Sequence, residues 1–287
     1  MKVAVVQMVS GVALEANLAA ARALLAAAAD AGAELAVLPE YFCILGRRDT
    51  DKLAIQERFG EGPIQEFLSR SAQELGLWVV GGTLPLTIES EDRAAEGQGK
   101  AQGLRQTAKV TNTCLVFAPD GRCTARYDKI HLFRFDNGLE RFDESRVLAP
   151  GSNPVMFELP SRDGHLWRIG MSVCYDLRFP ELYRGYAKQG ADLLLAPSAF
   201  TYVTGQAHWE LLLRARAVEN QAFMAAAAQG GLHENGRSTW GHSMLVGPWG
   251  QVLAQQATDA GLVCADLSVS ERVAAHAKIP ALEHRVL

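Results

Sequence analysis

Short apolar segments alternate with longer amphipathic segments along almost the whole chain. The short ones are rich in β-branched residues and predict strands, whereas the longer ones repeat apolar residues at helical spacing. Strands are expected at residues 2–6, 35–38, 77–84, 111–117, 123–127, 222–229 and 263–267, helices at 14–31, 62–75, 208–221 and 270–278, and a strand–helix–strand unit at 166–195. The pattern favours an α/β fold in which two packed sheets are flanked by helices.

Two turn sequences predict hairpins within this alternation. They are Pro119-Asp120-Gly121 and Gly247-Pro248-Trp249-Gly250. Residues 89–106 are polar and lack periodicity, which predicts an exposed loop that either decorates the fold or overhangs a pocket, and residues 136–153 are expected to be irregular. Because no Pro- or Ser-rich linker divides the chain, residues 1–287 are predicted to form one domain.

The composition narrows the class of protein. Hydrophobic residues make up 48% of the chain, which is enough apolar material for a core. The formal net charge of -4 and the lack of a basic stripe argue against nucleic acid or an anionic membrane as the main partner. Residues 1–8 read as a first strand rather than a signal peptide, and no apolar run is long enough to span a bilayer, so we expect a cytoplasmic protein.

The cysteines have neither the number nor the spacing that is typical of disulfide-linked proteins or structural zinc sites. There are five, an odd number, and no pair has CxxC spacing. Both features disfavour a set of disulfides and a structural zinc site, so no metal is expected. The cysteines are Cys43, Cys114, Cys123, Cys174 and Cys264.

Cys174 stands out because of where it falls in the pattern. It ends a predicted strand and precedes a helix that begins at Pro180, so its side chain is expected at the edge of a sheet. The nearby helix N-terminus and Arg178 are both expected to favour the thiolate, which would make Cys174 a nucleophile. The alternative is that Cys174 is a small buried hydrophobe, as many free cysteines are.

Glu40 and Lys129 lie at comparable positions. Glu40 follows the buried strand Ala36-Val37-Leu38, and Lys129 follows a hairpin strand and is flanked by apolar residues. Taken singly, Glu40 could be a solvated acid and Lys129 a surface charge. Together with Cys174 they could hydrolyse an amide or a nitrile, since a thiolate attacks carbon, a carboxylate moves protons and an ammonium stabilises an oxyanion.

The segments around these three residues resemble the nitrilase superfamily of carbon–nitrogen hydrolases. The similarity rests on Leu38-Pro39-Glu40, on residues 128–132 and on residues 172–181, in that order. Further similar segments extend to Pro248-Trp249-Gly250, so that the resemblance covers nearly the whole chain.

The resemblance implies a fold and a set of roles. The fold is a four-layer α-β-β-α sandwich that associates, as a homodimer or a higher homo-oligomer, through the helices after the catalytic strands. Glu40 is implied as general base, Lys129 as oxyanion stabiliser and Cys174 as a nucleophile that forms a thioester. A second glutamate is placed at Glu144, with Glu140 as the competitor. The backbone N–H of Tyr175 would complete the oxyanion hole, and no metal or organic cofactor is implied.

Within the superfamily, residues 198–217 and 226–229 are most similar to the branch that contains deaminated-glutathione amidase. That resemblance implies that the amide bond of deaminated glutathione is cleaved, which releases 2-oxoglutarate and cysteinylglycine. The neighbouring ω-amidase branch acts on 2-oxoglutaramate. Gln229 favours the deaminated-glutathione amidase branch over it. Both substrates carry a carboxylate, for which Arg178 is a reasonable partner unless it pairs with Glu181.

Two other interpretations stay open. A true nitrilase would use the same residues on a nitrile. A protein of the same fold could also be a non-catalytic binding module, although such a module has no chemical need for Glu40, Lys129 and Cys174 together.

Overall fold

Two large β-sheets pack face to face in the computed structural model, which describes residues 1–88, 109–138 and 140–286. The loop predicted at 89–106 lies outside these residues. The first sheet contains β1 (Lys2–Gln7), β2 (Leu35–Val37), β3 (Trp78–Val80), β4 (Leu84–Thr87), β5 (Val110–Phe117), β6 (Cys123–Asp128), β9 (Leu148–Ala149) and β18 (Gly261–Asp266). The second contains β10 (Met156–Pro160), β11 (Leu166–Gly170), β12 (Leu193–Leu195), β13 (Phe223–Ala226), β16 (Ser243–Val246) and β17 (Val252–Gln256).

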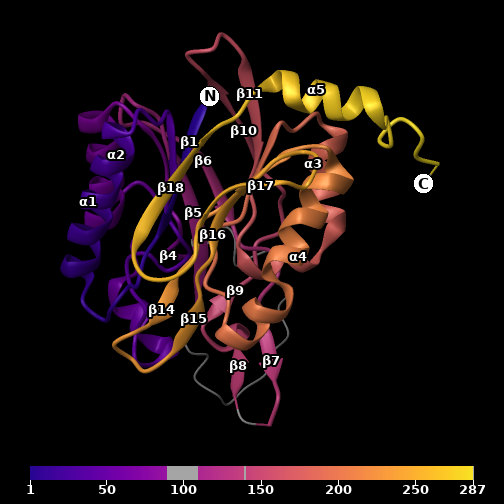
Figure 1. Cartoon of the computed structure of the whole chain (residues 1–287). Coiled ribbons are helices and arrows are strands. Elements are labelled where there is room, and N and C mark those ends of the chain that lie inside the picture. The colour runs from indigo at the N-terminus through magenta and orange to yellow at the C-terminus, as the bar shows by residue number, and fades with distance from the viewer. Residues whose placement is uncertain (89–108, 139, 287) are drawn as a thin grey trace.

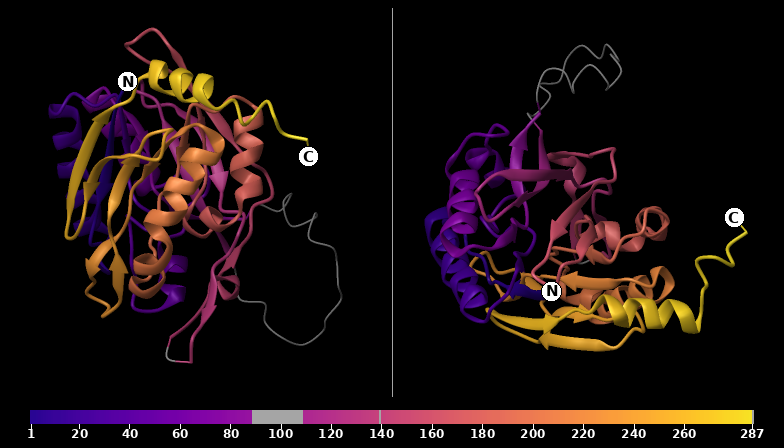
Figure 2. Two further views of the ribbon diagram at one scale, coloured as in Figure 1. Left: turned by 45° about the vertical axis from the view of Figure 1, so that its right-hand side comes forward. Right: turned by 90° about the horizontal axis from the view of Figure 1, so that it is seen from above.

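Helices cover the outer face of each sheet (Figures 1 and 2). The first sheet is covered by α1 (Leu14–Asp30) and α2 (Pro63–Leu75), and the second by α3 (Pro180–Lys188) and α4 (Tyr202–Asn220). The layers therefore follow the order helix, sheet, sheet, helix, which is the predicted four-layer sandwich. A further helix, α5 (Val269–Lys278), lies at one end of the sheets (Figure 1).

The central strands are apolar throughout because both of their faces are buried. In β1, Val3 and Val5 belong to the core that includes the second sheet, whereas Ala4 and Val6 belong to the core under α1 and α2. Successive side chains of a strand point to opposite faces, so a strand between two layers needs apolar residues at every position. The inner strands β1, β2 and β3 are parallel, as are β11, β12 and β13, and antiparallel strands flank both sets.

Most predicted elements are present, and both predicted hairpins form, as β5–β6 and β16–β17. The strand predicted at 77–84 is in fact two, β3 and β4, because the chain changes direction at Gly81-Gly82. Gly82 has a φ of 52°, a conformation that glycine adopts without strain.

Two other predictions were wrong. The segment predicted to be irregular at 136–153 takes part in a hairpin of β7 (Arg134–Asp136) and β8 (Arg141–Asp143), followed by a 3₁₀ turn at Glu144–Arg146 and then β9. The helix predicted from residue 208 begins at Tyr202, since the hydroxyl of Thr201 accepts the amide hydrogen of Thr204 and caps it. A further hairpin, β14 (Gly230–Leu232) with β15 (Ser238–Trp240), was not predicted.

Of the helices in the described ranges, none is long and apolar enough to cross a membrane.

Candidate active site

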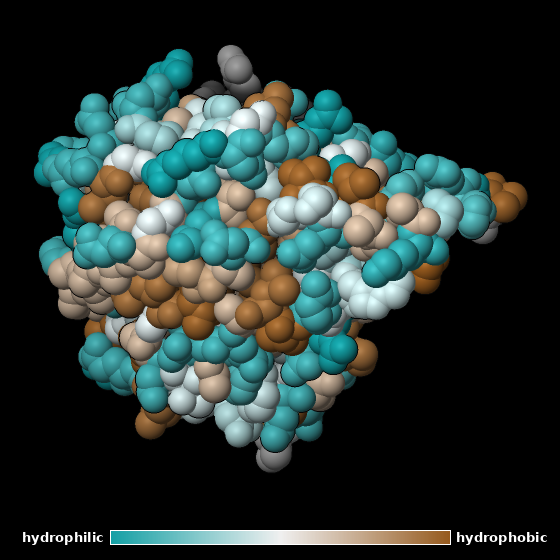
Figure 3. Space-filling view, turned by 45° about the horizontal axis from the view of Figure 1, so that its top comes forward, coloured by the Kyte–Doolittle hydropathy of each residue, from teal (hydrophilic) through white to brown (hydrophobic). Residues whose placement is uncertain are grey.

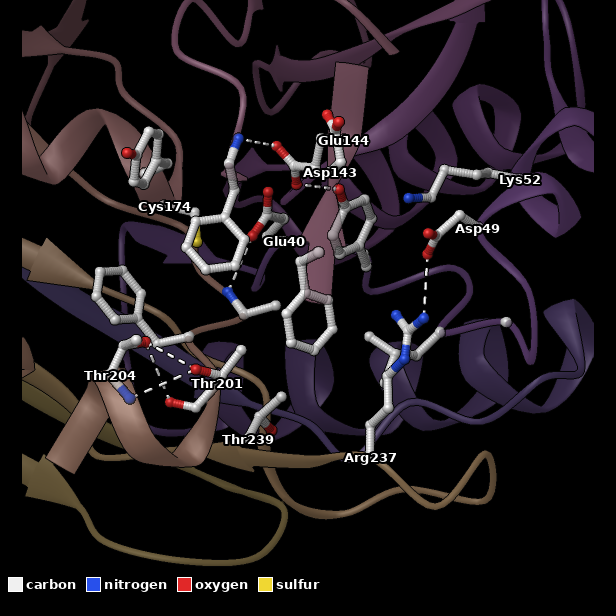
Figure 4. Close-up of a pocket in the computed structure, with 18 of the residues that line it drawn as sticks. Glu40, Asp49, Lys52, Asp143, Glu144, Cys174, Thr201, Thr204, Arg237 and Thr239 are labelled. Atoms are coloured by element: carbon white, nitrogen blue, oxygen red, sulfur yellow. Dashed lines mark hydrogen bonds and ion pairs between the residues drawn. The ribbon is translucent and has the colours of Figure 1, made fainter. Parts of the chain in front are cut away.

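Three of the predicted site residues lie at strand ends and come together. Glu40 and Cys174 line one pocket (Figure 4), and Lys129 is buried beside it, in contact with Glu40. Glu40 follows β2 and Lys129 follows β6, both in the first sheet. Cys174 follows β11 of the second sheet and opens a short 3₁₀ helix, Cys174–Arg178. The site thus lies where the ends of strands from both sheets converge.

Lys129 is held between two carboxylates. Its ammonium nitrogen lies 2.9 Å from Oε1 of Glu40 and 2.8 Å from Oε2 of Glu144. The side chains of Lys129 and Glu40 are each only 1% exposed. Burial by itself would lower the pKa of Lys129, but the charges of Glu144 and Glu40 outweigh it and hold that pKa well above its ordinary value. Lys129 is therefore a permanent cation in the site.

The two carboxylates differ in their surroundings. Glu40 accepts hydrogen bonds from the side-chain amide of Asn112, at 2.9 Å, and from the backbone N–H of Ala199, at 3.0 Å. Burial nevertheless raises the pKa of Glu40, with Lys129 opposing and the negative charge of Glu144 adding to the rise. A carboxylate with a raised pKa is suited to accept a proton and to return it.

Glu144 is stabilised as an anion. The hydroxyl of Tyr41 donates to it at 2.8 Å and the backbone N–H of Phe133 at 2.7 Å. Burial opposes ionisation, but the charges of Lys129 and Lys52, together with these donors, lower the pKa of Glu144. The competitor, Glu140, is exposed at the edge of the pocket, so the structure brings Glu144 and not Glu140 to Lys129.

Cys174 has an unusual backbone conformation. Its φ is 50°, although it is not a glycine, and its amide donates to the carbonyl of Pro197 at 2.9 Å. Residues in this conformation are uncommon and concentrate at functional sites. The side chain is buried and within hydrogen-bonding reach of Glu40 (Figure 4).

The prediction that the Cys174 thiolate is favoured was wrong. Burial and the negative charge of Glu40 together raise the pKa of the thiol well above its ordinary value, and Lys129 offsets this only in part. The sulfur therefore keeps its proton, and a base is needed to remove it.

Arg178 lines the pocket near Cys174 without an acidic partner among the described residues. Its guanidinium lies over the rings of Tyr175 and Phe200, and Nη1 is 3.3 Å from Nδ1 of His208. The alternative ion pair with Glu181 is not formed. The Tyr175 amide lies in the first turn of the 3₁₀ helix, where backbone N–H groups lack an acceptor within the helix.

Two residues that contact the charged groups were not predicted as site residues: Tyr41, which donates to Glu144, and Asn112, which donates to Glu40. Asp176 was also not predicted, and it accepts a hydrogen bond from Tyr127, two positions before Lys129. Asn112 could have been found as a polar residue in the buried strand β5, where a side-chain amide needs hydrogen-bond partners. Tyr41 follows Glu40 directly and gave no signal of its own. The described residues contain no cluster of three or more His, Cys, Asp or Glu side chains that could hold a metal ion.

A carbon–nitrogen hydrolase family model matches residues 2–277. The chain belongs to this family. This hydrolase is 36% identical over 285 residues to the deaminated glutathione amidase of Synechocystis, covering 99% of the chain and 97% of the relative. It is 37% identical over 270 residues to the omega-amidase NIT2 of Danio rerio, covering 94% of the chain and 88% of the relative.

Its structure is similar to that of Nit3 from Saccharomyces cerevisiae, described as a member of branch 10 of the nitrilase superfamily. The TM-score is 0.82, with 28% sequence identity, and the match covers 98% of this hydrolase and 94% of the yeast chain. The predicted family is thereby confirmed, as is the predicted carbon–nitrogen hydrolase class.

Proposed function

We propose that this hydrolase cleaves the amide bond of a small carboxylate-bearing substrate through a thioester on Cys174, and that deaminated glutathione is that substrate. The observation that carries the reaction is that Cys174 and Glu40 line one pocket and that the buried Lys129 ammonium lies 2.9 Å from Glu40. The substrate is supported by the similarity to the amidase of Synechocystis and by Arg178, a cation in the pocket without an acidic partner among the described residues.

In the first half of the reaction, Glu40 accepts the thiol proton while the sulfur of Cys174 attacks the carbonyl carbon. The carbonyl oxygen becomes an oxyanion, stabilised by the Lys129 ammonium and by the Tyr175 backbone N–H. When the C–N bond breaks, the amine takes the proton from Glu40 and leaves, and the acyl group stays on sulfur. Because the thiol pKa is raised, this proton transfer to Glu40 is required rather than optional.

In the second half, Glu40 takes a proton from water as the water oxygen attacks the thioester carbon. The C–S bond breaks, the sulfur regains the proton, and the acyl part leaves as a carboxylic acid. Glu144 remains an anion throughout. Its role is to hold the Lys129 ammonium in position between the two carboxylates.

A second candidate is the omega-amidase reaction on 2-oxoglutaramate, favoured by the 37% identity to the enzyme of Danio rerio. The acyl group is the same in both reactions, and only the leaving group differs. Deaminated glutathione releases a dipeptide with its own carboxylate, whereas 2-oxoglutaramate releases ammonia.

The decisive experiment is a mass-resolved incubation of the purified protein with deaminated glutathione, 2-oxoglutaramate and a simple nitrile. Cys174→Ala and Glu40→Gln serve as controls. We expect release of cysteinylglycine and a transient acyl adduct on Cys174 in the wild type only. Turnover of 2-oxoglutaramate alone would assign the omega-amidase reaction. Absence of both turnover and adduct would refute the proposed function and support the binding module.

We further propose that two or more copies associate through the helix layer after β11 and β12. Four large apolar side chains of α4 are exposed: Tyr202, Val203, Leu211 and Val218. One view of the surface shows hydrophobic residues gathered between hydrophilic ones (Figure 3). Exposed large apolar side chains on one helix are a feature of interaction sites. The single-domain organisation and the cytoplasmic location stay predictions.

A further inference from the structure

Lys52 lies in the wall of the active-site pocket, on the far side of Glu40 and Glu144 from Cys174 (Figure 4). It comes from the 3₁₀ helix Asp49–Ile55, which follows β2 in the chain. The mechanism above makes no use of it as a reacting group. It is the second basic side chain, besides Lys129, that acts on the charge of Glu144.

The Lys52 ammonium has no hydrogen bond or ion pair in the described part of the chain. Its nitrogen lies over the ring of Tyr41, 4.3 Å from the ring centroid. The three carboxylates whose charges act on Lys52 are already engaged, since Asp49 pairs with Arg237 at 3.1 Å and both Glu144 and Glu40 pair with Lys129. Lys52 thus presents to the pocket an ammonium that has no direct ion-pair partner among the described residues.

Burial lowers the pKa of Lys52, while the charges of Glu144 and Asp49 oppose that change. A partly desolvated ammonium without a counter-ion is costly, and an anion from the ligand relieves that cost. A carboxylate is the anion that the proposed substrate supplies, and a charge-assisted hydrogen bond to it is stronger than a neutral one.

We propose that Lys52 binds the carboxylate of the substrate's acyl part, the part that remains on Cys174 after the amine has left. This inference rests on the proposed function and names the group that recognises its acyl half. Lys52 lies over the ring of Tyr41, which itself donates to Glu144, whereas Arg178 shares an exposed contact with His208. The amine leaves the pocket before the acyl part does, so we assign it to the more exposed side, next to Arg178.

Two cations that line the pocket therefore divide the substrate between them. Lys52 recognises a carboxylate that deaminated glutathione and 2-oxoglutaramate share. Arg178 recognises a carboxylate that only deaminated glutathione carries, in its leaving dipeptide. Loss of Lys52 should weaken the binding of both substrates. Loss of Arg178 should weaken only the binding of deaminated glutathione.

The test compares two amides that differ only at the carboxylate. 2-Oxoglutaramate carries it, and 4-oxopentanamide has a methyl group in its place. In Lys52→Met we expect kcat/KM for 2-oxoglutaramate to fall about tenfold to hundredfold further than kcat/KM for 4-oxopentanamide, because any effect of Lys52 on Glu144 is common to both amides. Lys52→Arg should recover part of the loss. Lys278→Met is the matched control, because Lys278 also lies over an aromatic ring, that of Trp249, but does not line the pocket.

A binding measurement makes the inference independent of turnover. Calorimetry with 2-oxoglutarate compares Cys174→Ala with the double variant Cys174→Ala, Lys52→Met, and we expect the double variant to bind more weakly by a similar factor. Equal losses for the two amides, or unchanged affinity for 2-oxoglutarate, would overturn the assignment of Lys52. If the wild type hydrolyses neither substrate, the proposed function fails, while the calorimetry still decides whether Lys52 binds a carboxylate.

Discussion

Tyr127 donates its hydroxyl hydrogen to Asp176 across 2.6 Å, and this contact joins the segment that carries Lys129 to the segment that carries Cys174. Tyr127 precedes Lys129 by two positions, and Asp176 follows Cys174 by two. The same buried carboxylate accepts the backbone N–H groups of Val173 and His131, each at 2.9 Å. One carboxylate therefore fixes the relative position of the nucleophile and the oxyanion stabiliser, which come from different sheets.

Tyr127→Phe should reduce kcat more than it reduces substrate binding. Burial and the charge of Asp176 raise the pKa of Tyr127, so its hydroxyl stays protonated and always donates. Losing a hydrogen bond to a charged group costs about 1.5–3 kcal/mol of stability. Tyr186→Phe is the control, because its buried hydroxyl donates to the carbonyl of Met171 and accepts the N–H of Val155, and has no hydrogen bond to Asp176. Denaturant unfolding should show a loss of stability in both variants. Steady-state kinetics should show a lower kcat only in Tyr127→Phe, and equal kcat values would contradict the positioning role.

Glu144→Gln and Glu140→Gln form a pair that tests which glutamate belongs to the site. Glu144→Gln removes one of the two anions that hold Lys129, and we expect kcat to fall by about two orders of magnitude. Glu140→Gln changes an exposed residue and should leave kcat close to the wild-type value. Similar effects of the two substitutions would argue against the assignment of Glu144.

Activity should rise with pH through the pKa of Glu40 and then stay level into mildly alkaline solution. Glu40 must be unprotonated to act as the base, and its pKa is raised, so the acid limb is expected above the ordinary value of 4.5. The pKa values of Cys174 and Lys129 both lie well above their ordinary ranges, so neither changes charge near neutrality. The profile of kcat/KM provides the measurement. A limb at about 8.5, the value of an ordinary thiol, would indicate instead that a free thiolate reacts.

Gly82→Ala should damage both stability and activity. A β-carbon at Gly82 would lie 2.1 Å from the backbone oxygen of Pro39, so the turn that carries Glu40 must shift. Gly32→Ala is the control, since Gly32 also has a positive φ but has nothing within 4 Å of the added carbon. We expect about 1–2 kcal/mol of destabilisation at Gly32 from the left-handed backbone alone, and more at Gly82. Thermal unfolding and kcat together test this, and a fully active Gly82→Ala protein would contradict it.

The sequence by itself determined where the chemistry lies along the chain. Apolar strands are predicted to end at Leu38 and just before Cys174. Such strand ends can be found from the local sequence, because a buried strand must be apolar whatever surrounds it. The four-layer sandwich and the family also followed from the sequence, through the segments around Glu40, Lys129 and Cys174.

Only the tertiary structure decided the charge states and partners in the site. The pKa of Cys174 is raised by burial and by Glu40, which belongs to the other sheet, so the local signals from Arg178 and the helix N-terminus pointed the wrong way. The unpaired state of Lys52 likewise depends on Asp49 being taken by the distant Arg237. Electrostatic energies follow distances in space and the loss of water, and neither can be read from the order of residues in the chain.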